Sequence, residues 1–222
     1  MKKRALIIAP HPDDETLGMG GSICKMIEDG MEIFLLTVAG HLPPLYKEGD
    51  YEITTNEAKK AYKILGITDY KFLEIPSTMI GEEPIHVFNG KINSVVSEFE
   101  PHYVFCPFPD RHIDHRLVFE STLIATRPVR AGKNIEMVAA YETLSETHWN
   151  APYIEPNFNP NYVIDISNHI DRKLDALRCY DSQITEEEGP RSIKAVKALA
   201  EFRGTQSGFN FGEAMYIIRM TG

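Results

Sequence analysis

Hydrophobic and polar positions follow two different periods along this chain, and they predict strands and helices in turn. Short apolar runs bounded by turn residues predict buried strands at 5–9, 32–38, 69–75, 102–106 and 136–141. Between them, hydrophobic residues at helical spacing predict amphipathic helices at 17–29, 58–65, 88–99 and 115–125. Strands that alternate with helices predict an α/β fold, a Rossmann-like three-layer αβα sandwich with a mostly parallel sheet.

The pattern is less regular after residue 141. The stretch 150–161 is rich in proline and asparagine, which predicts a long surface loop. Beyond it we expect a strand at 162–166, a helix that begins at 170, a helix at 193–200 and a last strand at 214–219. Ser167 or Asn168 is expected to cap the first of these helices. No repeat or linker divides the sequence, so residues 1–222 are predicted to form one domain.

Charge and composition exclude some classes of protein. The formal net charge is −9, from 32 acidic and 23 basic residues, whereas proteins that bind the nucleic-acid backbone show the opposite bias. The apolar run after the basic N-terminus is too short for a signal peptide, and no stretch is long enough to span a membrane. The three cysteines form no C-x-x-C pair, which is typical of free thiols in a reducing compartment. We therefore expect a soluble, cytoplasmic protein.

Ligands of such a sheet bind at the carboxyl ends of its strands. The loops expected there are 10–16, 39–51, 76–85, 107–114 and 142–161. The first reads Pro-His-Pro-Asp-Asp-Glu, and the fourth continues into Pro-Asp-Arg-His-Ile-Asp-His. Taken alone, each is also compatible with an acidic helix start or a solvated loop. However, the adjacent Asp13 and Asp14 repel each other and resist burial unless a cation offsets their charge.

Together the first and fourth loops offer a histidine, an aspartate and a second histidine to one point. Three protein ligands with an open position are typical of catalytic zinc, which acidifies water and polarises a carbonyl. A neighbouring aspartate can accept a proton from that water, and a further histidine can stabilise the oxyanion or protonate the leaving amine. An aspartate hydrogen-bonded to that histidine would set its tautomer and keep it cationic.

Other signals are weaker. The glycines at 18–21 are similar to a dinucleotide loop, but acidic residues precede them where a pyrophosphate would lie, so we interpret them as close packing of a helix on the sheet. The chain has no G-x-S-x-G motif and no cysteine next to a histidine, so it offers no candidate nucleophile. His41 and His148 follow predicted strands at the active end, and we expect them to be substrate contacts.

The run from Pro10 to Glu15, continued by Gly18 and by Gly20-Gly21, resembles the signature of the PIG-L/LmbE-like N-deacetylases. The sequence His-Ile-Asp-His at 112–115 resembles the second motif of that family, and 178–183 and 203–214 resemble its C-terminal features. The resemblance implies a Rossmann-like fold and a zinc-dependent hydrolase that removes the N-acetyl group from an N-acetylated amino sugar or its conjugate.

The resemblance also implies roles for residues of the first loop. It implies zinc bound by His11, Asp14 and His115, and it makes Asp13 the general base. Iron(II) accepts the same ligands, because two histidines and one carboxylate also form the facial triad of non-haem iron oxygenases. Such an iron enzyme, or a non-catalytic metal- or sugar-binding module, is therefore an open alternative.

In the second motif, the resemblance makes His112, oriented by Asp114, the oxyanion stabiliser and general acid. These groups favour hydrolysis over both alternatives, because an acid–base set beside a metal is redundant for an oxygenase or a binding module. Some family members have a tyrosine two residues before the matching histidine. Asp110 stands there in this chain, and we expect the neighbouring Arg111 to contact substrate.

The sequence leaves the substrate and the assembly open. Candidates are N-acetylglucosamine conjugated to malate, inositol, a lipid or a nucleotide, N-acetylated chito-oligosaccharides, and secondary-metabolite glycosides. The expected partner is thus a small N-acetylated sugar or glycoconjugate and not a nucleic acid. Because trimers and hexamers are known in the family, a homo-oligomer is also considered.

Overall fold

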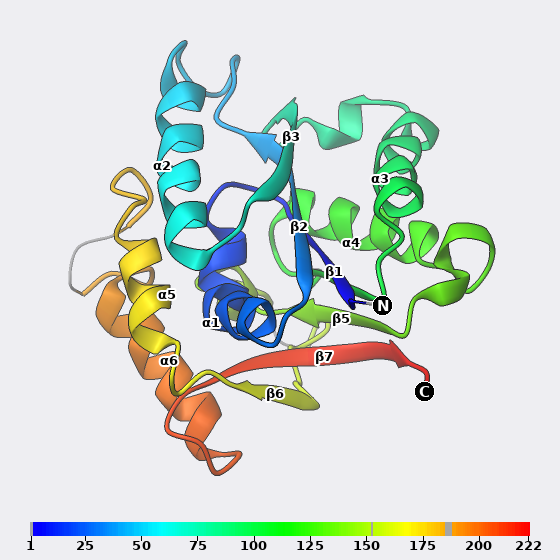
Figure 1. The fold of residues 1–222 in the computed structure, drawn as a ribbon. Coiled ribbons are helices and arrows are strands. Elements are labelled where there is room, and N and C mark those ends of the chain that lie inside the picture. Colours follow the sequence, from blue (N-terminus) through cyan, green and yellow to red (C-terminus); the bar gives the residue numbers. More distant parts are fainter. Residues whose placement is uncertain (1, 152, 185–187) are drawn as a thin grey trace.

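A computed structural model describes residues 2–151, 153–184 and 188–222, in which one seven-stranded sheet lies between two layers of helices (Figure 1). The strands are β1 (Arg4–Ala9), β2 (Glu32–Gly40), β3 (Asp69–Pro76), β4 (Tyr103–Pro107), β5 (Met137–Tyr141), β6 (Tyr162–Asp165) and β7 (Gly212–Met220). The helices are α1 (Asp14–Glu28), α2 (Asp50–Leu65), α3 (Ile85–Phe99), α4 (Ile113–Ala125), α5 (Ile170–Leu177) and α6 (Ile193–Thr205). Three short 3₁₀ helices are η1 (Ile80–Glu82), η2 (Arg130–Asn134) and η3 (Glu146–Trp149).

The strand order places two distant loops side by side. The order is β3-β2-β1-β4-β5-β7-β6, and β7 runs antiparallel to both of its neighbours while the other pairs are parallel. The chain moves outward from β1 through β2 to β3, and then crosses back to β4 on the other side of β1. The carboxyl ends of β1 and β4 therefore meet where the direction of winding reverses, which is where ligands bind in open α/β sheets. The predicted fold class is confirmed.

Each face of the sheet is covered by its own group of helices. One hydrophobic core joins the sheet to α1, α2, α5 and α6, and a second joins the opposite face to α3 and α4. The short apolar strands are buried because both faces of the sheet are covered, which explains why β1 carries no polar residue after Arg4. Over the described residues, no helix is both long and apolar enough to cross a membrane.

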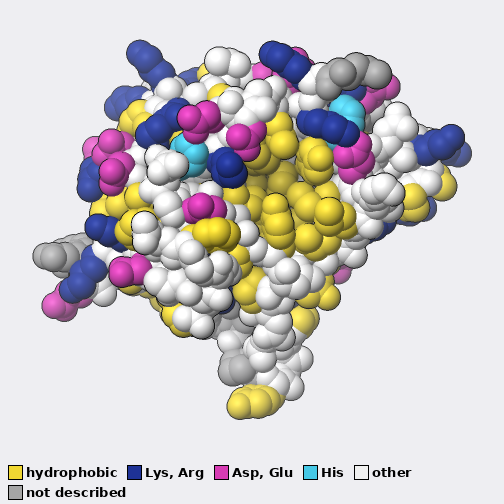
Figure 2. Space-filling view, turned by 60° about the horizontal axis from the view of Figure 1, so that its bottom comes forward, with side chains coloured by type: hydrophobic (Ala, Val, Ile, Leu, Met, Phe, Trp, Pro, Cys, Tyr) yellow, Lys and Arg dark blue, Asp and Glu magenta, His cyan; other side chains and the backbone are white. Residues whose placement is uncertain are grey.

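Hydrophobic side chains gather on one face of the molecule. Figure 2 turns the bottom of Figure 1 forward and shows hydrophobic side chains gathered in the middle of that face, where β6 and β7 run. The large exposed hydrophobic residues of these two strands are Tyr162, Tyr216 and Met220. The homo-oligomer considered from the sequence, a trimer or hexamer, stays a prediction.

The structure differs from the sequence prediction mainly at helix starts. Helix α1 begins at Asp14 instead of residue 17, because the backbone carbonyl of Asp13 already accepts hydrogen bonds from the amides of Thr16 and Leu17. The predicted caps of α5 are wrong. His169 is the N-cap residue, and the hydroxyl and amide of Ser167 instead donate to Asp165, at 2.6 and 2.9 Å.

The interpretation of the glycine run as a packing surface is confirmed. A Cβ atom on Gly18 would lie 2.4 Å from Cδ2 of Tyr141 in β5, and one on Gly21 would lie 2.8 Å from the side chain of Ile166. Helix α1 can therefore lie this close to β5 only if these positions carry no side chain. The close contact fixes the start of α1, and hence Asp13 and Asp14, relative to the sheet.

Candidate metal centre and active site

A cavity of about 220 Å³ opens at the carboxyl ends of the parallel strands. It is lined by His11, Asp13, His41, Tyr46, Ser77, Thr78, Arg111, His112, His115, Glu146, Gln183 and Arg191. Every one of the five loops expected at this end contributes a lining residue. Gln183 and Arg191 come from a sixth segment, between α5 and α6, which was not predicted to reach the site.

Two histidines contact the same carboxylate oxygen beside the cavity. Oδ2 of Asp14 lies 3.2 Å from Nδ1 of His11 and 3.3 Å from Nε2 of His115. Ligand atoms around a tetrahedral zinc ion, with bonds of about 2.0–2.2 Å, lie roughly 3.3 Å apart. The two separations from Asp14 thus suit this ion.

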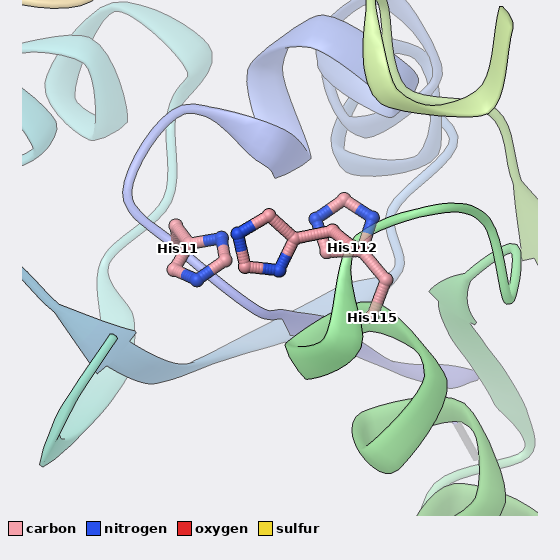
Figure 3. A group of neighbouring side chains, drawn as sticks. All are labelled: His11, His112 and His115. Carbon is pink, nitrogen blue, oxygen red and sulfur yellow. The ribbon is translucent and has the colours of Figure 1, made fainter. Parts of the chain in front are cut away.

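The three histidines His11, His112 and His115 also gather closely, and Figure 3 shows their rings side by side. Each can offer a nitrogen such that these atoms lie within 4.8 Å of one another, which makes them an alternative ligand set. The set that includes Asp14 has two short separations, both from Oδ2 of Asp14. It also adds the negative charge that a divalent cation needs in a buried site.

Outer contacts hold both candidate histidine ligands in place. Nδ1 of His115 lies 3.0 Å from Oδ2 of Asp110, and Nε2 of His11 lies 2.8 Å from Oδ2 of Asp114. A carboxylate on the second ring nitrogen fixes the orientation of a histidine ligand and raises its basicity. Thr147 donates to the same oxygen of Asp110, so that carboxylate is itself held in place.

The electrostatics of this cluster favour a cation. Burial opposes a charge on His11 and His115, but the carboxylates beside them outweigh burial and raise their pKa values to about 9 and about 10. Burial also opposes ionisation of Asp14, yet His115 and His11 hold its pKa well below the usual range. Among the described residues, Nε2 of His115 and Oδ1 of Asp114 are buried polar atoms without a hydrogen-bond partner. The donor set therefore fits a divalent metal ion.

Asp13 lies next to this cluster in a strained backbone conformation. Its φ is 114°, in a region that favours glycine, and its side chain is buried. This conformation directs the side chains of Asp13 and Asp14 to different partners. Oδ2 of Asp13 accepts a hydrogen bond from Nη1 of Arg191 at 3.1 Å. Burial raises the pKa of Asp13 to about 7, with Arg191 lowering it and Asp14 raising it.

His112 is oriented by a different group from the one expected. Its Nδ1 accepts a hydrogen bond of 3.2 Å from the backbone amide of Asp114, and the Asp114 carboxylate instead contacts His11 and the amide of Thr78. With Nδ1 as acceptor, the neutral ring carries its proton on Nε2. Burial, His11 and His115 lower the pKa of His112 to about 4, which favours the neutral ring.

The expected substrate contacts separate into two groups. His41 and Arg111 line the cavity, and the His41 ring stacks on Tyr46 with 4.0 Å between centroids. His148 is not among the described residues that line it. Its Nε2 lies 3.4 Å from Oε2 of Glu142, which also pairs with Arg203.

Glu146 and Arg191 are the two charged cavity residues that sequence reasoning missed. Glu146 lies in a loop expected at the active end, but nothing distinguished it there from neighbouring polar residues. Arg191 follows a stretch without hydrophobic periodicity, and no motif marked it. Its place in the site depends on how α5 and α6 pack against α1, which a local pattern does not report.

Comparison with known proteins is consistent with this site. The family model described as PIG-L, GlcNAc-PI de-N-acetylase, matches residues 6–126, which include both polar loops. A diacetylchitobiose deacetylase from Thermococcus kodakarensis is 27% identical over 97% of this chain and 83% of its own length. Glu146 and Arg191 lie outside the range that the family model matches.

Solved structures share the fold. The N,N'-diacetylchitobiose deacetylase from Pyrococcus horikoshii superposes with a TM-score of 0.77 at 23% identity, covering 97% of this chain and 84% of its own. The zinc-inhibited form of teicoplanin deacetylase Orf2 superposes with a TM-score of 0.76 at 18% identity, covering 99% of both chains. At these identities the structural likeness supports the three-layer architecture rather than a particular substrate.

Proposed function

This chain belongs to the PIG-L family, GlcNAc-PI de-N-acetylase, and we propose that it uses one divalent metal ion, zinc, to remove the acetyl group from an N-acetylated amino sugar or its conjugate. The relatives that share its sequence include deacetylases, which are amide hydrolases that act on N-acetyl groups. They act on diacetylchitobiose and on an inositol-linked acetamido-glucopyranoside, among others. Sugars of this class are accordingly the expected substrates.

One observation carries the proposal. Asp14 lies close to both His11 and His115, at separations that suit two ligands of one metal ion, while Asp13 and His112 line the cavity beside them. His11, Asp14 and His115 would hold the ion. When bound, it supplies Lewis acidity, which polarises the amide carbonyl and acidifies a water molecule.

The flanking side chains account for the proton transfers. Asp13 takes a proton from the attacking water, and Arg191 holds its carboxylate at the cavity. The proton on Nε2 of His112 donates a hydrogen bond to the oxyanion that develops on the amide carbonyl. Asp13 then passes the proton that it has accepted to the departing amine. Asp13 and His112 therefore both end the cycle in their initial protonation states.

Zinc is preferred over iron(II) for two reasons. The ligand separations match tetrahedral coordination, and an acid–base pair beside the metal serves hydrolysis but not oxygen activation. The cytoplasmic location stays a prediction.

The test is an acetate-release screen of the zinc-loaded protein against N-acetylated sugars, carried out without oxygen. We expect acetate and free amine in equal amounts. The matched control is His115→Ala, which should lose both metal and activity while keeping its circular dichroism spectrum. Turnover that appears only after oxygen is admitted would favour the iron enzyme. Sugar binding without acetate release would favour a binding module.

A further inference from the structure

Two arginines line the cavity, and one carboxylate contacts both. Oε2 of Glu146 accepts a hydrogen bond from Nε of Arg111 at 2.7 Å, and its Oε1 lies 3.3 Å from Nη2 of Arg191. The Glu146 side chain is 8% exposed, whereas the Arg111 side chain is 51% exposed. Glu146 is thus a buried anion whose two oxygens each face a guanidinium at the cavity wall.

The pairing extends to the catalytic group. Nη1 of Arg191 contacts Asp13, so the ionic contacts run from Asp13 through Arg191 and Glu146 to Arg111. Apart from histidines, these four are the charged side chains among the described lining residues. Within this series of contacts, two positive and two negative charges balance, so the two arginines add no excess positive charge for binding an anion.

We propose that Glu146 is a specificity-determining residue, which makes the site accept uncharged N-acetylated sugars and reject conjugates that carry a carboxylate or phosphate. The inference rests on the proposed function, because it concerns the substrates of the same site. It goes beyond that function in excluding anionic conjugates, which the sequence left open as candidates.

The physical basis is competition for the same donors. An anionic group on the substrate would find Nε of Arg111 already bonded to Glu146, and it would also lie close to that second negative charge. Guanidinium pairs with a carboxylate or phosphate are strong because the hydrogen bonds are charge-assisted, and like charges brought together oppose binding. An uncharged sugar meets neither obstacle, since it needs no free cation.

The experiment compares methyl N-acetylglucosaminide with N-acetylglucosamine 1-phosphate as substrates of zinc-loaded protein. The native protein should favour the neutral sugar in kcat/KM. In Glu146→Gln, the ratio should shift toward the phosphate by on the order of 10-fold, mainly through KM, because the competing negative charge beside Arg111 is removed. The affinity of Glu146→Gln for the phosphate sugar, measured by calorimetry, should increase by a similar factor.

Two further variants make the result specific. Arg111→Gln should move the ratio in the opposite direction, and Glu146→Gln combined with Arg111→Gln should lose the gain. Glu142→Gln is the matched control, because Glu142 is also buried and paired with an arginine, Arg203, but does not line the cavity. It should leave the ratio unchanged.

The outcomes separate the two proposals. If Glu146→Gln releases acetate but keeps the native ratio, or if the native protein uses the phosphate sugar as well as the neutral one, the role of Glu146 is wrong and deacetylation stands. If no variant releases acetate but Glu146→Gln gains phosphate-sugar binding over Glu142→Gln, the role of Glu146 stands and deacetylation fails. If binding is unchanged as well, both fail.

Discussion

Oδ2 of Asp110 lies 3.0 Å from Nδ1 of His115 and thereby turns Nε2 of that ring toward Asp14. Asp110 occupies the position at which some family members have a tyrosine. In this chain the Asp110 carboxylate orients and polarises His115, a candidate metal ligand, through the ring nitrogen that does not face Asp14. The contact is buried, so solvent does not screen it.

From this contact we expect Asp110→Asn to weaken zinc affinity by roughly 10- to 100-fold, the usual effect of removing an outer partner of a histidine ligand. Activity at saturating zinc should fall much less. Competition with a chromogenic chelator measures the affinity, and the exposed Asp171→Asn serves as the control. Unchanged affinity in Asp110→Asn would show that this carboxylate does not support the ligand.

The adjacent Asp13 and Asp14 should fail in different ways when replaced. Asp14→Ala removes a predicted ligand, so zinc should be lost first and excess zinc should restore part of the activity. Asp13→Ala removes the predicted base, so zinc content should stay near one per chain while kcat falls by about 10²-fold or more. Metal analysis and steady-state kinetics on both proteins decide the matter, and the reverse pattern would exchange the two roles.

Replacing Arg191 should change the pH dependence of the reaction. Asp13 must be ionised to accept a proton, and the Arg191 guanidinium 3.1 Å away lowers its pKa. In Arg191→Met this lowering is lost and the pKa of Asp13 rises, so the acidic limb of kcat/KM should move to higher pH. Arg191→Lys should move it less. If the acidic limb does not move in Arg191→Met, ionisation of Asp13 does not set that limb.

The buried pair of Lys173 and Glu213 is expected to matter for stability. Glu213 accepts hydrogen bonds from the amides of Gly21 and Ser22 in α1, and Lys173 donates to it and to the carbonyl of Leu17. Glu213→Ala leaves a buried cation unpaired, so the free energy of unfolding should fall by about 3–5 kcal/mol. Urea unfolding measures the change.

The exposed ion pair of Arg178 and Asp175 provides the control for that measurement. Their side chains are 54% and 60% exposed. Asp175→Ala should therefore change the free energy of unfolding by less than about 1 kcal/mol. Similar losses in Glu213→Ala and Asp175→Ala would argue against a special role for the buried pair.

Two glycines in helices should respond oppositely to alanine. A Cβ on Gly18 would lie 2.7 Å from the carbonyl oxygen of Glu142, so Gly18→Ala should cost about 1–3 kcal/mol. Gly90 lies within α3, and a Cβ there would meet nothing within 4 Å, so Gly90→Ala should stabilise by roughly 0.5–1 kcal/mol. Thermal unfolding of both variants gives the comparison, and equal changes would contradict the packing argument.

The elements and the two polar loops follow from local sequence patterns. The apolar run of β1 and the helical stripe of α3 are recognisable because burial on a sheet or helix imposes a fixed period on nearby residues. The loops after β1 and β4 could be expected to meet because parallel strands present their carboxyl ends to one edge. This reasoning places His11 near His115 although about a hundred residues separate them.

Other parts of the site depend on the course of the backbone through loops, which the hydrophobic pattern does not predict. Asp114 directs its carboxylate to His11, and its backbone amide to His112, because of how α4 begins. Arg191 reaches Asp13 only because α5 and α6 pack against α1 and β7. The fold class and the two polar motifs could be predicted from the sequence because local spacing encodes them, and the family resemblance implied the ligands. Tertiary structure alone decided which charges meet at the cavity, because contacts between distant loops depend on packing and not on sequence period.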